Sequence, residues 1–302
     1  MAHETATGSA SDARTTERAG GARCSNAIGG FGTLLRDWRT RRRASQLDLA
    51  LGAGVSARHV SFLETGRARP SRTMVLQLAA ELDVPLEARN DWLIAAGLAP
   101  AFRRRDADDA DIAMAREAVA WMVDRHDPYP GFALDRHWRI VRANGMATRL
   151  FEGFGIAEGD SLLDAFLGCE PLREAIANMD EIAAHTRARV ATELKHYGED
   201  RVLGDALERL DAWIDPAALR HDPGPVITGA FVPVRYRLGD VRLSFFSTFS
   251  HFVSTQDIAL AELRVELMFP ADEASRDWLL ASAERRSECE RRSERERREG
   301  AA

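Results

Sequence analysis

The segment from Gln46 to Glu64 places the strongest constraint on how this chain folds. It reads QLDLALGAGVSARHVSFLE. Ala50 is small, which lets a second helix cross closely over the first, and Gly54 supplies the positive φ that a tight turn needs. Apolar residues on both sides of the turn fix the angle between the two helices: Leu49, Val55, Val60 and Leu63. This spacing is typical of a helix-turn-helix, whose second helix enters the major groove of DNA.

The residues around this segment predict a compact all-α domain of five short helices over residues 29–99. Four apolar residues share one helical stripe at the start: Phe31, Leu34, Leu35 and Trp38. Serines stand where the next three helices should begin: Ser45, Ser56 and Ser71. A fifth helix is expected from about Pro85 to Ala96, ending at Gly97.

Charge is distributed unevenly along the chain. The net charge is −6, which by itself argues against a nucleic-acid partner. Residues 31–75, however, hold nine arginines and only three acidic residues, a net +6, so the remainder carries −12. A compact arginine cluster in an acidic chain indicates a small DNA-binding module.

Length and composition exclude several classes of protein. The 302 residues are enough for two domains. No apolar run approaches the length of a transmembrane helix, and the polar N-terminus lacks the apolar core of a secretory signal. The three cysteines are scattered outside any CxxC pair: Cys24, Cys169 and Cys289. They indicate neither a disulfide framework nor a zinc site, and we expect a protein of the reducing cytoplasm with no membrane partner.

The remaining chain predicts a second domain of mixed α and β structure, so the fold class is α+β. Residues 1–28 lack periodicity and are expected to be a disordered tail. A charged linker covers 100–111, the second domain covers 112–283, and a charged tail covers 284–302. That tail is either a solvated helix or disordered.

Within 112–283, alternating apolar residues predict the strands of an antiparallel sheet. Residues 132–141 form two short strands around a polar turn, 226–252 contain a hairpin with its turn at Gly239-Asp240, and 262–269 form another strand. Helices are expected at 112–125, around Met146 to Phe151, over 171–214 with a break near Gly198, and from about Asp272.

Two stretches carry a family resemblance. VSFLETGRARPSR, from Val60 to Arg72, makes residues 31–97 resemble the Cro/repressor-type (XRE) helix-turn-helix domain. The continuation LDVPLEARNDWLIAAGLAP, from Leu82 to Pro100, is similar to the MmyB-like regulators. Such regulators join this domain to a PAS-like ligand-binding domain. The resemblance therefore implies a ligand-responsive transcription factor and not an enzyme.

The resemblance assigns residues to the DNA interface. It places five on the face that meets base edges: Ser56, Ala57, Arg58, His59 and Ser61. Arg58 is the strongest candidate, because a guanidinium can bond guanine O6 and N7 together. The phosphate contacts implied are Gln46, Arg67, Arg69 and Arg72.

Other positions of this domain keep more than one interpretation. His59 contacts a base or a phosphate, or is merely exposed. Phe62 reads a thymine methyl group or packs inward. Arg41 to Arg43 contact DNA or are solvated at the end of a surface helix.

The same resemblance predicts a contact inside the domain and an assembly. Arg39 and Glu64 should face each other as a partly buried pair that ties the second helix of the motif to its scaffold. One module buries little DNA surface, so we expect a homodimer on an inverted-repeat operator.

The aromatic residues of the late strands are candidates for a pocket wall, with Phe231, Tyr236, Phe245 and Phe249 as the selected set. Phe246, Phe252 and Phe269 belong to the same group, and all of them could instead form an ordinary filled core. A fatty acid or similar apolar ligand is implied by the MmyB-like resemblance. The alternative is a dimerisation or partner-docking domain without a ligand.

Catalysis and an architectural DNA-binding role are the competing functions. The histidines lack the spacing of a metal site, and GxSxG, P-loop and GxGxxG motifs are absent from the sequence. We expect no metal and no cofactor. An architectural binder would leave the second domain, with its own core, unexplained.

Overall fold

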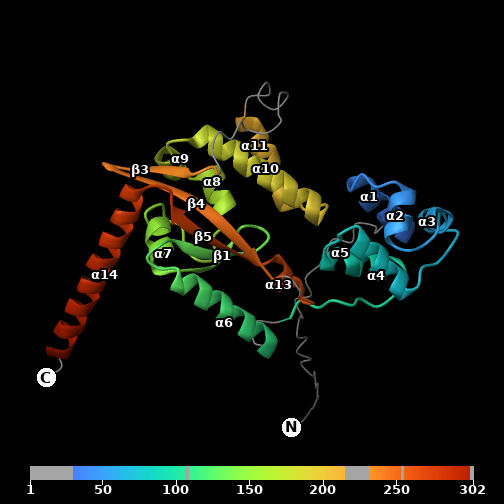
Figure 1. The fold of residues 1–302 in the computed structure, drawn as a ribbon, viewed down its shortest axis with the longest axis horizontal. Coiled ribbons are helices and arrows are strands. Elements are labelled where there is room, and N and C mark those ends of the chain that lie inside the picture. Colours follow the sequence, from blue (N-terminus) through green and yellow to red (C-terminus); the bar gives the residue numbers. More distant parts are fainter. Residues whose placement is uncertain (1–29, 106–108, 215–230, 253–254, 300–302) are drawn as a thin grey trace, which may run out of the picture.

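The computed structural model describes residues 30–105, 109–214, 231–252 and 255–299 (Figure 1). The expected tail at 1–28 and the strand residues 226–230 lie outside the described residues, as do 106–108 of the linker and 300–302 of the C-terminal tail. The expected α+β architecture is confirmed: an all-α domain precedes a domain built on an antiparallel sheet.

The first domain has the five predicted helices. They are α1 (Phe31–Arg41), α2 (Gln46–Gly52), α3 (Ala57–Glu64), α4 (Arg72–Glu81) and α5 (Leu86–Ala95). Ser45, Ser56 and Ser71 cap α2, α3 and α4, because each hydroxyl accepts a hydrogen bond from the backbone N–H three residues later. The serines therefore fix where the helices begin.

The turn between α2 and α3 has the geometry that its sequence predicts. Gly54 has φ +62°, in the left-handed region that favours glycine. The amide of Gln77 in α4 donates to the carbonyl of Ala53 at 2.6 Å and so fastens the turn to the scaffold. Side chains from all five helices meet in one core: Leu35, Leu49, Val60, Leu78 and Trp92 are at most 1% exposed. This core sets the angle at which α3 is presented.

The second domain is built on a five-stranded sheet. Its strands are β1 (Gly131–Leu134), β2 (Ile140–Ala143), β3 (Val234–Leu238), β4 (Val241–His251) and β5 (Arg264–Pro270). They lie in the order β2-β1-β5-β4-β3, and every neighbouring pair is antiparallel. The hairpin at Gly239-Asp240 is present, and Gly239 has φ +61°.

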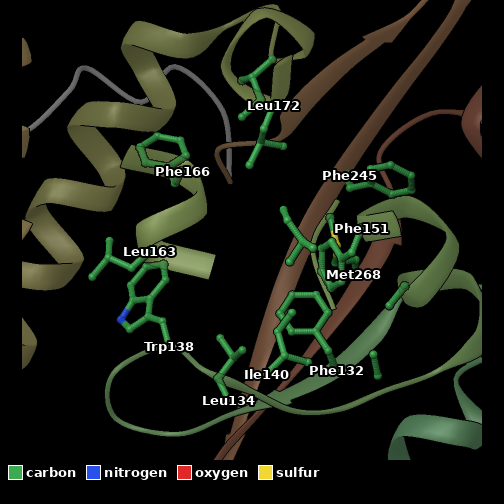
Figure 2. Close-up of a cluster of buried hydrophobic side chains, with 14 of the residues drawn as sticks. Phe132, Leu134, Trp138, Ile140, Phe151, Leu163, Phe166, Leu172, Phe245 and Met268 are labelled. Carbon is green, nitrogen blue, oxygen red and sulfur yellow. The ribbon is translucent and has the colours of Figure 1, made fainter. Parts of the chain in front are cut away.

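Helices cover both faces of this sheet. They are α6 (Ala110–Arg125), α7 (Gly145–Glu152), α8 (Leu162–Gly168), α9 (Glu170–Ala175), α10 (Met179–Tyr197), α11 (Arg201–Trp213), α13 (Ile258–Glu262) and α14 (Glu273–Glu299). Val119 and Val123 of α6 pack on one face against Ala133 and Val265. The opposite face packs against α8 to α11, and Figure 2 shows Phe166 of α8 across the core from Phe132, Phe245 and Met268 of the strands.

Asn144, which follows β2, joins three elements. Its side chain caps α7 by accepting from the N–H of Ala147, and it also accepts from the N–H of Gly131 in β1. Its amide group donates to the carbonyls of Val123 and Tyr129. A buried amide with every partner in place holds α6, β1 and α7 in one arrangement.

Three sequence predictions need correction in detail. The helical stretch over 171–214 is also broken at 176–178, where the N–H of Ala177 donates to Arg235 of β3. The strand expected from Glu262 begins at Arg264, because Asp257 caps the short helix α13 instead. Residues 284–299 continue α14 without a break, so the predicted boundary at 283 falls inside one helix.

Candidate functional site

The helix α3 presents the residues predicted to read DNA. Ser56 is its N-cap, Arg58 is exposed, and His59 and Ser61 are half-buried on the same short helix. The Arg58 guanidinium lies 5.2 Å from the centroid of the Phe62 ring one turn later. Phe62 therefore lies beneath Arg58 and supports it, which neither of the two earlier interpretations included.

The predicted phosphate-binding residues have different surroundings. Arg67 and Arg69 are exposed in the loop after α3. Arg72 is also exposed, but its Nη1 donates to the carbonyl of Ala99 at 2.8 Å. Gln46 donates through Nε2 to Glu64 at 2.7 Å, so this amide is already engaged inside the domain. The DNA roles of these residues stay predictions.

Arg39 and Glu64 form the predicted contact. Arg39 donates to both carboxylate oxygens of Glu64, at 2.6 and 3.1 Å, and the Glu64 side chain has no exposed surface. Burial alone would raise the pKa of Glu64. Hydrogen bonds from Arg39 and Gln46 and the charges of Arg39 and Arg36 outweigh it and hold this pKa below its usual range. The partly buried pair is confirmed.

A cavity of about 430 Å³ lies between the sheet and the helices α8 to α10. The four aromatics selected from the sequence all line it: Phe231, Tyr236, Phe245 and Phe249. Its other apolar walls come from the strands and the helices and include Phe132, Phe151, Phe166, Leu172, Ile182 and Met268. A mostly apolar cavity of this size is the usual form of a small-molecule site.

Polar residues gather at one part of the wall, and sequence reasoning missed them. Arg189 and Thr186 belong to α10, and Glu266 belongs to β5. Glu266 alternates with Val265 and Leu267, a pattern that predicts an outward, solvated side chain. Because helices cover both faces of the sheet, Glu266 instead faces the cavity. The prediction missed Glu266 because the alternation of residues along a strand does not show whether helices cover both faces of the sheet.

Burial sets the protonation of the cavity's titratable groups. It raises the pKa of Tyr236 and lowers the pKa of His185, so both side chains are neutral at pH 7. Burial also lowers the pKa of Arg189 from its usual range, and the carboxylates of Glu266 and Glu193 offset this only in part. Arg189 still carries its charge at pH 7.

The end of α10 contacts the first domain (Figure 1). Arg42 of that domain donates to the carbonyls of Lys195 at 3.1 Å and His196 at 3.4 Å, in the last turn of α10. The same guanidinium donates to Leu82 and Asp83 at the end of α4. Arg42 is therefore engaged with backbone carbonyls of both domains, and a DNA contact by Arg41 to Arg43 stays a prediction.

A second contact between the domains is an ion-pair network. Arg136, in the turn between β1 and β2, bonds Glu87 of α5 at 2.5 Å. It also bonds Asp200 at 2.9 Å and Glu262 at 3.0 Å within its own domain. The two domains are thus joined by polar contacts at two places.

Other kinds of site receive no support within the described ranges. There, no group of three or more histidine, cysteine, aspartate or glutamate side chains is arranged to hold a metal ion. None of the described helices has both the length and the apolar character to span a bilayer.

Comparison with protein families assigns both domains. The family model described as the MmyB-like transcription regulator ligand binding domain matches residues 115–281, more than half of the chain. The chain belongs to the MmyB-like transcription regulators. A model described as a helix-turn-helix domain matches residues 31–92 of this MmyB-like regulator. It is a DNA-binding transcription regulator with a ligand-binding domain, and both matched families are those of regulators.

Comparisons with individual proteins give weaker similarities than the two family models. No curated protein matches this MmyB-like regulator. Among solved structures, it is similar to the PAS domain of BvgS from Bordetella pertussis, at 13% identity and a TM-score of 0.26. That similarity covers 58% of this chain and 98% of the PAS-domain chain.

Proposed function

We propose that this MmyB-like regulator binds a specific DNA operator through α3 and that a fatty acid or similar acyl ligand in the cavity changes its affinity for that operator. Ser56, Ala57, Arg58, His59 and Ser61 supply the base contacts. Gln46, Arg67, Arg69 and Arg72 supply the phosphate contacts, which position the protein without reading sequence. A regulator of this kind acts in the cytoplasm, beside the DNA that it binds.

The acyl chemistry of the ligand comes from the family resemblance, and the character of the cavity supports it. Its walls are mostly aromatic and aliphatic, as an acyl chain requires. Tyr236 and Phe245 contribute to this wall from β3 and β4, as does Phe249, and Phe231 contributes from the segment before β3. The first domain supplies the cationic surface that DNA needs, and the acidic remainder of the chain stays away from the phosphates.

The observation that carries the proposal is that one helix touches both the cavity and the DNA-binding domain. Ile182, Thr186 and Arg189 of α10 line the cavity, and the last-turn carbonyls of the same helix accept hydrogen bonds from Arg42. A helix of this length extends over about 28 Å and moves as a rigid unit. A ligand that shifts α10 therefore shifts the contact with α1.

The ligand must also favour one arrangement of the domains over another. A ligand with equal affinity for both arrangements changes nothing, however tightly it binds. A typical coupling of about 1–3 kcal/mol would alter operator affinity roughly 5–150-fold.

Titration of an operator with delipidated full-length protein, with and without a panel of acyl compounds, tests the proposal. We expect at least one compound to change the operator affinity. If none changes it, and none binds the protein, the second domain is a dimerisation or partner-docking unit. Measurable turnover of a bound compound would instead support an enzymatic role.

We propose further that the regulator acts as a homodimer on an inverted repeat. A single helix-turn-helix module buries too little DNA surface for tight specific binding, and two-fold symmetry matches paired half-sites. Light scattering of the complex measures the stoichiometry. One chain per operator would exclude the dimer.

A further inference from the structure

Arg189 is the one arginine or lysine among the described residues that line the cavity. Its guanidinium lies between two aromatic rings, 4.1 Å from the centroid of Trp138 and 3.9 Å from that of Phe249. The guanidinium therefore cannot turn freely, and its hydrogen-bonding edge is held in a fixed plane. A charged group fixed at the edge of an apolar cavity is suited to orient a ligand with one polar end.

The hydrogen bonds of this guanidinium are incomplete. Nε donates to Glu193 at 3.1 Å, and Nη1 lies 3.5 Å from a carboxylate oxygen of Glu266. Nη2 is buried and has no hydrogen-bond partner within the described part of the chain. Buried N–H groups are normally paired, so an unpaired guanidinium nitrogen beside a cavity calls for an acceptor.

Neighbouring groups do not supply that acceptor. Glu193 already accepts from Arg264 at 2.5 Å and from the indole N–H of Trp138 at 2.8 Å. Arg264 lies next to Arg189 and is itself short of acceptors, since its Nε and Nη2 are buried without partners among the described residues. Two buried guanidinium groups therefore share one carboxylate, and Glu266 touches only one of them.

We propose that the cavity binds a long-chain carboxylate whose head group is held by Nη2 of Arg189 and whose apolar tail lies against Phe132, Phe151 and Phe166. This inference rests on the proposed function, in which the cavity binds an acyl ligand, and it adds the residue that selects the head group. A carboxylate fits because an arginine edge offers directed N–H donors and the resulting bond is charge-assisted.

Phe249 is the side chain that must move to admit the head group. Nη2 is covered, and of the two rings that enclose the guanidinium Phe249 is the more exposed, at 39% against 8% for Trp138. Rotation of this ring would open the guanidinium to the cavity while Trp138 stays in the core. Arg189 is thus a specificity-determining residue, and Phe249 controls access to it.

The test compares dodecanoate with 1-dodecanol, which share a chain and differ in the charge of the head group. Binding of each to delipidated full-length protein is measured by calorimetry. In the wild type we expect the acid to bind about 10-fold or more tightly than the alcohol, the size expected for one charge-assisted hydrogen bond. Arg189→Met should bring the affinity for the acid down to that for the alcohol and leave the alcohol unchanged.

The matched control is Arg187→Met, on the same helix. Arg187 pairs with Asp211 and does not line the cavity, so this variant should keep the preference for the acid. Arg189→Lys keeps the charge without the planar donor edge and should restore the preference in part.

Each outcome has a distinct meaning. If the wild type binds both compounds equally, or if Arg189→Met retains the preference for the acid, the head-group inference is wrong and the apolar site stands. If neither compound binds, the proposed ligand-binding function fails together with it. If Arg189→Met does not fold, Arg189→Lys tests the same residue, and a full wild-type preference for the acid in that variant would contradict the role of the planar donor edge.

Discussion

Arg39 in α1 holds both carboxylate oxygens of Glu64 at the last residue of α3, and the Glu64 side chain is fully covered. Gln46 at the start of α2 donates to the same carboxylate at 2.7 Å. One acidic side chain therefore joins the three helices that place α3 for DNA binding.

Glu64→Ala should destabilise the DNA-binding domain far more than loss of a surface carboxylate. The substitution leaves the Arg39 guanidinium half-buried without its partner, and breaking a buried pair in this way costs about 3–5 kcal/mol. Thermal unfolding measures the effect. Asp37→Ala, an exposed carboxylate on α1, is the control and should change the melting temperature little. Equal melting temperatures for the two variants would contradict the prediction.

The same pair predicts how stability depends on pH. Because the pKa of Glu64 is lowered in the folded state, its contribution is present above the unfolded pKa of about 4.3. It is lost as the pH falls from there through the lowered folded pKa. In urea unfolding, the free energy by which wild type exceeds Glu64→Gln should be constant from about pH 6 to 7, because the folded and unfolded pKa values of Glu64 both lie below this range. This difference should shrink below about pH 4.3. If this difference in stability grew as the pH fell, the pKa of Glu64 would be raised on folding and the prediction would be wrong.

The first domain was predictable because its signals are local. Ser45, Ser56 and Ser71 mark helix starts three residues from the N–H groups they bond, and Gly54 marks the turn. The late hairpin was predictable for the same reason, since alternation and Gly239 lie close together in the sequence.

The polar part of the cavity was not predictable, because it is made by residues far apart in the chain. Arg189 meets Glu266 across 77 positions, and Arg42 meets Lys195 across 153. The break at Ile176 likewise depends on pairing with Tyr236 of β3. Nothing in the neighbouring sequence distinguishes these side chains from solvated ones. The four aromatics were selected as aromatic residues of the late predicted strands, which are themselves recognised from short-range patterns, and all four line the cavity.

Arg58 and Arg69 should affect DNA binding in different ways. Arg58→Ala removes a base-reading side chain, so it should cost about 1–3 kcal/mol on the cognate operator and relax one base position. Arg69→Ala removes a phosphate contact, so it should weaken binding to all sequences and reduce the salt dependence by about one unit. Binding to selected oligonucleotides at several salt concentrations separates the two effects. Equal binding of wild type and Arg58→Ala at matched salt would show that another residue reads the base.

Ser247→Trp should block the cavity. Ser247 lines it from β4, opposite Met268, so an indole at this position occupies the space of a ligand. Thr248→Trp is the matched control, because the next side chain along a strand points to the other face, and Thr248 is exposed. We expect dodecanoate binding to fall at least about 10-fold, a loss of about 1.4 kcal/mol, in the first variant only. Circular dichroism checks that both variants are folded, and unchanged binding by folded Ser247→Trp would place the ligand elsewhere.

Glu87→Ala should weaken the coupling between ligand and operator without disturbing either site. Glu87 belongs to the DNA-binding domain and forms an ion pair with Arg136 of the second domain. It lies outside α3 and does not line the cavity. Arg136 keeps Asp200 and Glu262 as partners, so neither domain is left with an unpaired buried charge. The contact between the domains is then looser, and a ligand-induced shift is transmitted less completely.

The measurement is the ratio of operator affinities with and without dodecanoate. In wild type we expect a ratio in the roughly 5–150-fold range of typical couplings, and in Glu87→Ala a ratio closer to one. Glu208→Ala, an exposed carboxylate on α11, controls for the change in charge and should keep the wild-type ratio. Because coupling is reciprocal, operator DNA should alter dodecanoate affinity by the same factor in each protein. A wild-type ratio retained in Glu87→Ala would mean that this ion pair does not carry the signal and would leave the contact between Arg42 and α10 as the route.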